Sequence, residues 1–145
     1  MNRASPEAKK LAKRLIALEK SGRKATGTNP LPVFHATELL RPQLAILMGN
    51  GGYRAMMARS LVLGGEEIPW LHAIHVKSDG SLEGLADIHS QLNNGDFLEG
   101  RVVLLAQLFG LLVAFIGEAL TLRIVREVWP KVFLDDLDFS NGGTK

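Results

Sequence analysis

The sequence predicts a mainly helical, single-domain bundle of about five helices around a long apolar C-terminal helix. Three observations support this class. A chain of 145 residues has the usual size of one domain. Hydrophobic residues make up 46% of it with few aromatic side chains, and they lean towards Leu and Ala, which favours helices. The run from Val102 to Leu122 contains two strongly polar side chains, Gln107 and Glu118.

A first helix is expected from about Pro6 to Lys20. Ser5 can cap its free N–H groups, and proline is favoured in a first turn. Its apolar residues recur at helical spacing and form one stripe: Ala8, Leu11, Ala12, Leu15 and Leu18. Residues 1–24 also carry eight basic and two acidic side chains, so they form a basic amphipathic helix or arm. Residues 25–32 have the composition of a linker.

A helical core domain is predicted over residues 33–130. Its first helix runs from about Val33 to Met48, and Pro42 should kink it or divide it into two abutting helices. The glycine-rich segment 49–52 then breaks the chain. A further helix from about Tyr53 to Leu63 should end at the Gly64-Gly65 pair.

One short β-hairpin is predicted near residues 74–84. Apolar residues there flank Ser78-Asp79-Gly80-Ser81, and Asp-Gly is a favourable tight-turn dipeptide. A plain loop is the alternative for residues 68–85. A fourth helix is expected from about Leu82 to Leu92.

The last helix is predicted to start at a capping box formed by Asp96 and Glu99, and it could continue to Trp129. About 33 helical residues would span about 50 Å, which is longer than a domain of this size needs. The helix should therefore protrude, cross a membrane, or bend near Gly110 or Gly117. Residues 131–145 form an acidic flexible tail.

Small residues in this last helix form a candidate interaction surface. They lie three or four positions apart and make a ridge that another backbone can approach closely: Ala106, Gly110, Ala114 and Gly117. By length and a mean hydropathy of about +2, residues 102–122 could also span a bilayer. Gln107 and Glu118 would be costly against lipid, which favours burial within protein.

Four residues are predicted to be buried polar groups: Gln107, Glu118, Arg54 and Arg59. A carboxylate in an apolar helix must be neutral, paired or near an edge. Arg54, Arg59 or His72 could pair with Glu118. Such an ion pair would determine how the helices cross.

No catalytic, nucleotide or metal motif is present, so no enzyme activity or cofactor is expected. The segment Gly49-Asn50-Gly51-Gly52-Tyr53-Arg54 lacks the Walker lysine and a preceding strand, and a turn between helices explains it better. His72 and His75, with nearby Glu66, Glu67 and His89, match no established ligand spacing. The chain has no cysteine.

The basic helix offers a second candidate surface, formed by Lys9, Lys10, Lys13 and Arg14. An acidic protein, an anionic membrane surface and nucleic-acid phosphate would all suit it. Specific nucleic-acid binding is disfavoured because no aromatic residues are interleaved with the basic ones. The alternative is a solvated amphipathic helix packed on its own domain.

Three blocks resemble stretches of small bacterial proteins of an uncharacterised family: LLRPQLAILMGNGGYRAMMARSLVL, IPWLHAIHVKSDGSLEGL and VVLLAQLFGLLVAFIGEALTLRIVREVWP. The resemblance covers about residues 39–130 and implies one unit with a peripheral arm and tail. It implies no activity. We expect a non-enzymatic, cytoplasmic protein–protein interaction or regulatory module that forms a homo-oligomer or binds another protein. An inner-membrane protein inserting residues 102–122 is the alternative, and a small-molecule ligand is left open.

Overall fold

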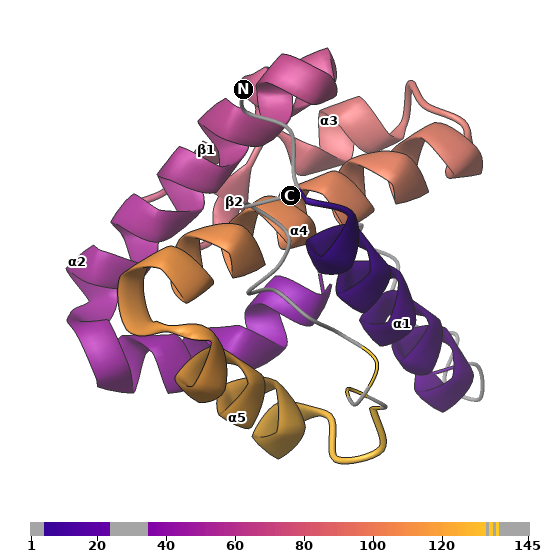
Figure 1. The fold of residues 1–145 in the computed structure, drawn as a ribbon. Helices are drawn as coiled ribbons and strands as arrows, with labels where there is room; N and C mark the ends of the chain where they lie inside the picture. Colours follow the sequence, from indigo (N-terminus) through magenta and orange to yellow (C-terminus); the bar gives the residue numbers. More distant parts are fainter. Residues whose placement is uncertain (1–4, 24–34, 133, 135, 137–145) are drawn as a thin grey trace.

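A computed structural model describes residues 5–23, 35–132, 134 and 136 (Figure 1). The prediction of a mainly helical fold is confirmed, with four long helices in the described part rather than about five: α1 (Pro6–Arg23), α2 (His35–Glu67), α4 (Asn94–Ile116) and α5 (Glu118–Val128). Shorter elements lie between α2 and α4: the 3₁₀ turn η1 (Pro69–Ala73), strands β1 (His75–Val76) and β2 (Leu82–Glu83), and α3 (Leu85–His89).

Helix α4 is the centre of the hydrophobic core, with α1 and α2 packed against it (Figure 1). Every residue from Val102 to Phe109 is buried. Burying a Leu or Phe side chain contributes about 1.5–3 kcal/mol, so this stretch is a main source of stability.

Helix α1 belongs to the same core. The Ser5 hydroxyl accepts a hydrogen bond from the Ala8 amide at 3.1 Å, as the predicted cap requires. Four residues of the apolar stripe, Ala8, Leu11, Ala12 and Leu15, are fully buried. The apolar face of the basic helix therefore packs on the core of the domain.

Helix α2 continues through two of the positions at which the sequence predicted an interruption. It continues through Pro42, because Leu40 and Leu44 on either side are fully buried and hold both turns on the core. The non-helical residue is Gly49, with φ 79° and ψ 164°, inside the predicted glycine break. The helix also passes Gly64 and Gly65.

The Gly64-Gly65 pair serves close packing instead of ending a helix. A Cβ on Gly64 would lie 2.9 Å from the Leu71 side chain, and one on Gly65 would overlap the His72 ring. The two glycines thus allow η1 to lie directly on α2.

The predicted hairpin is present, with His75 opposite Glu83 and Val76 opposite Leu82. Asp79 Oδ1 accepts hydrogen bonds from the Ser81 amide at 2.9 Å and hydroxyl at 2.6 Å, and Gly80 has φ 90°. Because Leu82 and Glu83 pair with β1, the fourth helix does not start at Leu82. It is reduced to the five residues of α3.

The long C-terminal helix starts and bends at definite residues. Asn93 is the N-cap, since its Oδ1 accepts from the Asp96 amide at 2.7 Å, so the capping box expected at Asp96 is wrong. Gly117, with φ 94° and ψ 158°, separates α4 from α5. The bend predicted near Gly110 or Gly117 is found at Gly117.

Candidate interaction surface at the end of helix α4

The small-residue ridge divides between the core and the surface. Ala106 is fully buried, whereas Gly110 and Ala114 are exposed and Gly117 is half-buried. A Cβ placed on Gly110 or Gly117 would meet no atom within 4 Å. The last two turns of α4 therefore present a flat strip to solvent.

Large apolar side chains are also exposed on α4 and α2. Phe115 in the last turn of α4 is 67% exposed, and Ile46 in α2 is 86% exposed. Ile46 and Leu47 also line a groove of about 300 Å³ whose other wall is α5, through Leu120 and Ile124. Figure 1 shows that the Gly49 region of α2 and the α4–α5 junction lie at one end of the molecule.

We name this region the α4-end surface, and we define it by its residues: Ile46, Leu47, Gly110, Ala114, Phe115 and Leu120.

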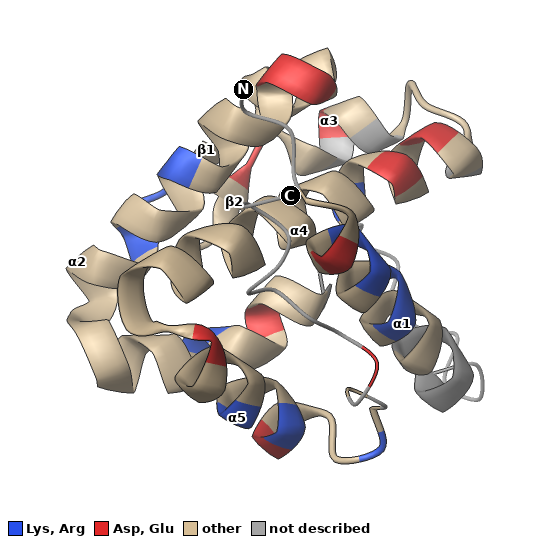
Figure 2. Cartoon of the chain, in the orientation of Figure 1, with Lys and Arg blue, Asp and Glu red and all other residues tan. Residues whose placement is uncertain are grey.

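Charged groups of both signs border the groove. Arg123 Nε lies 4.0 Å from Glu127 Oε2, and both side chains are more than half exposed. An exposed pair at that distance contributes little to stability. Figure 2 shows acidic and basic residues together on α5, while most of α4 carries neither.

The predicted buried polar residues lie apart. Gln107 is buried in α4. Glu118 is half-buried at the first position of α5, where its carboxylate meets the positive end of that helix. Arg59 is exposed, so its predicted burial is wrong, and Arg54 is half-buried with an unpaired buried Nε.

The predicted ion pair of Glu118 is also absent. Within residues 35–132, no salt bridge joins Glu118 to Arg54, Arg59 or His72. The reason is the bend at Gly117, which moves Glu118 from the middle of an apolar helix to a helix start.

The candidate basic surface is largely neutralised within the chain. Lys9 pairs with Glu67 at the end of α2. The Arg14 guanidinium donates to both carboxylate oxygens of Asp136 at 2.7 and 2.5 Å and lowers the pKa of that carboxyl to about 2. Lys10 lies 3.9 Å from Asp136. Lys13 is exposed, and no ion pair to it is found among the described residues.

His72 and His75 line one small cavity of about 180 Å³ together with Val62. His72 Nε2 lies 3.3 Å from the Val62 carbonyl oxygen, within hydrogen-bond distance. Among the described residues, no group of three or more potential ligands is placed to hold a metal ion. The His89 side chain is outside the described part of the structure.

Ile46 and Phe115 were missed as surface residues by sequence reasoning. Both side chains are as apolar as core residues, so hydropathy does not distinguish them from buried positions. The available signal was their position beside Gly49 and Gly117, the two breaks in the helices.

Comparison with known proteins gives no match: no family model, curated protein or solved structure is similar to the chain. In the described residues, Gly95–Ile116 is long and apolar enough to cross a membrane, with a mean hydropathy of 1.8. Of the 18-residue apolar window in this helix, 56% is buried within the fold.

Proposed function

We propose that this protein is a helical interaction module that self-associates through the α4-end surface. The observation that carries the proposal is the set of exposed residues in the second half of α4, Gly110, Ala114 and Phe115. Gly110 and Ala114 share one face of the helix, and the exposed Phe115 ring lies on an adjacent face of the same turn. The groove lined by Ile46, Leu47 and Leu120 adds apolar surface at the same end of the molecule, and apolar surface patches mark interaction sites in soluble proteins.

The shape of the surface suits another helix. Gly110 and Ala114 have no bulky side chain, so a partner helix can approach the α4 backbone closely. The neighbouring groove of about 300 Å³ can receive a protruding side chain such as a phenylalanine ring. Burial of apolar area at about 25 cal/mol per Å² would supply the driving force.

The charges favour a second copy of this chain as the partner. In a two-fold dimer, residue i of one copy faces residue j of the other and the reverse. Arg123 and Glu127 border the same groove, so each could face its opposite charge across such an axis. A surface with both positive and negative charges at its rim can pair with a second copy of itself.

Membrane association is the second candidate, because α4 meets the length and hydropathy requirement. The burial of α4 under α1 and α2 weighs against insertion, since a span would have to leave that core. Arg123 and Glu127 beside the apolar surface would also be costly in lipid.

Light scattering after size-exclusion chromatography of the untagged protein tests the proposal. We expect a defined oligomer without detergent. Phe115→Glu should raise the dissociation constant at least about tenfold, because a buried unpaired charge costs more than about 1.4 kcal/mol. Val62→Glu is the matched control, as Val62 is also a half-exposed apolar residue but lies beside His72.

A monomer at all concentrations, or equal loss of association in both variants, would contradict self-association through this surface. Extraction from cells that requires detergent would instead support the membrane candidate.

A further inference from the structure

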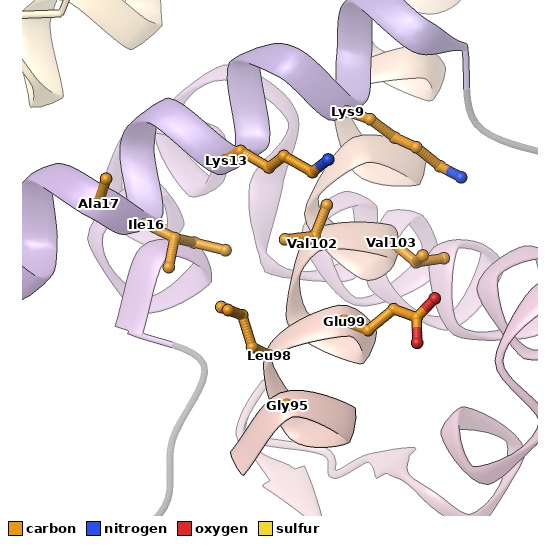
Figure 3. Close-up of a pocket in the computed structure, with 9 residues that line it drawn as sticks. All are labelled: Lys9, Lys13, Ile16, Ala17, Gly95, Leu98, Glu99, Val102 and Val103. Carbon is orange, nitrogen blue, oxygen red and sulfur yellow. The ribbon is translucent and has the colours of Figure 1, made fainter.

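A cavity of about 460 Å³ lies between α1 and the first half of α4, away from the α4-end surface (Figure 3). Small-molecule sites have volumes of about 300–1,000 Å³ and mostly apolar walls. Here the walls are aliphatic side chains from both helices, including Ile16, Leu98 and Val102. The space is a half-open groove, because Lys13, Ala17 and Leu98 in its walls are exposed, while Ile16 and Val102 form its buried floor.

The cavity is amphipathic along its length. Figure 3 shows Ala17, Ile16 and Leu98 at one end and Lys9 with Glu99 at the other. Lys13 extends from α1 across Val102, between the two ends. An occupant therefore meets hydrocarbon at one end and charge near the middle.

The charges at the cavity are not equivalent. The Lys9 ammonium is bound by Glu67, which leaves Lys13 as the cation without an ion-pair partner among the described lining residues. Glu99 supplies the opposing charge, on the side of Lys9 (Figure 3).

We propose that this cavity binds a free, single-chain carboxylic acid of the fatty-acid type. Its chain lies against Ile16, Ala17 and Leu98, and its carboxylate accepts a hydrogen bond from Lys13 Nζ. Lys13 has no ion-pair partner among the described lining residues, so it can pair with one carboxylate. An apolar space of this volume can hold a single unbranched hydrocarbon chain. The proposal is independent of self-association, because the α4-end surface shares none of these residues.

Isothermal titration calorimetry of the full chain with dodecanoate, below its micelle concentration, tests this site. We expect one molecule per chain with micromolar affinity. Dodecyltrimethylammonium, with the same chain and the opposite charge, should bind at least about tenfold more weakly.

Four variants locate the site. Lys13→Gln should weaken dodecanoate binding about tenfold, and Glu99→Gln should tighten it a few-fold because it removes the opposing charge. Ala17→Trp fills the aliphatic end from an exposed position and should abolish binding. Lys10→Gln is the matched control: it removes a lysine of the same helix that does not line the cavity, and affinity should not change.

Circular dichroism melts establish that each variant is folded before titration. Absence of dodecanoate binding, or equal binding of the cationic analogue, would overturn the proposal. Wild-type affinity in folded Lys13→Gln and Ala17→Trp would place the ligand elsewhere and overturn it as well. Binding to anionic vesicles without binding to the monomeric acid would show a membrane surface instead.

Discussion

At the scale of single residues, two glycines decide where the helices change direction. Gly49 and Gly117 have nearly the same backbone conformation, with φ of 79° and 94° and ψ of 164° and 158°. This region is essentially restricted to glycine, because a Cβ strains the backbone there. Gly110 provides a contrast, since it also has open space around it but lies inside a regular helix.

Gly117→Ala should lower the free energy of unfolding by about 1–3 kcal/mol through backbone strain. Gly110→Ala should raise it by about 0.5–1 kcal/mol, because alanine loses less conformational entropy in a helix. Urea denaturation in the Phe115→Glu background separates stability from association. Equal effects of the two substitutions would show that the backbone at Gly117 is not strained by a side chain.

The Arg14–Asp136 pair predicts a pH-dependent contribution to stability. The Asp136 pKa is lowered from 3.8 to about 2 in the folded protein, first by the Arg14 hydrogen bonds. The pair therefore stabilises the fold above pH about 4, and this contribution is lost as the pH falls towards about 2.

Titration of the Asp136 carboxyl by ¹³C NMR checks this prediction. In Arg14→Gln the Asp136 pKa should return towards 3.8, and high salt should reduce the shift in the wild type because the pair is exposed. Lys77→Gln, on the distant hairpin, serves as the control. An unchanged Asp136 pKa in Arg14→Gln would rule out the pair as the cause.

At the scale of elements, Arg41 connects α2 to the hairpin. Its Nη2 donates to the Asp79 carbonyl oxygen in the turn, and its Nη1 donates to Glu38 Oε1 at 3.2 Å. The guanidinium also lies 5.9 Å from the centre of the Tyr53 ring. A two-stranded sheet is marginal alone, so this attachment should hold the turn in place.

Arg41→Met keeps the apolar stem and removes the hydrogen bonds. We expect a loss of about 0.5–1.5 kcal/mol in stability. Hydrogen exchange of the Lys77 and Gly80 amides, which bond to Ser81 and Lys77 carbonyls across the turn, should become faster. Unchanged protection at both amides would contradict the attachment. Lys77→Met is the control for loss of a charge near the turn.

The elements that could be predicted from the sequence depend on residues that are close together along the chain. The Ser5 cap, the Asp79-Gly80 turn and the break at Gly49 all follow from local hydrogen bonds or backbone freedom. The ends expected at Gly64 and Asp96 failed for a different reason. Gly64 is glycine because Leu71 packs on it, and Asn93 lies one turn before Asp96 and caps the helix first.

At the scale of the whole molecule, α1 is part of one cooperative core. Leu11 is fully buried in that core, whereas Leu39 in α2 is 37% exposed. Leu11→Ala should therefore cost about 2–5 kcal/mol, and Leu39→Ala much less. A single thermal transition with a large shift for Leu11→Ala is the expected result. A neutral Leu11→Ala would show that α1 is a peripheral arm after all.

The fold also brings the basic and acidic ends of the chain together. The sequence shows a basic start and acidic residues near its end, but the pairing of Lys10 and Arg14 with Asp136 requires the segment after α5 to return towards α1. This pairing removes much of the basic surface that suggested nucleic acid or anionic lipid as partners. It leaves Lys13 beside the cavity as the uncommitted cation among the described residues of that surface.

The sequence by itself determined the mainly helical class, the hairpin and the choice of glycines at which a helix could turn, because these depend on periodicity and local backbone chemistry. Only the tertiary structure decided which residues of the apolar run are covered. Val102 and Phe115 have similar hydropathy, yet one is buried and the other exposed. Burial depends on which distant segments pack against a residue, and a local sequence pattern does not specify those segments.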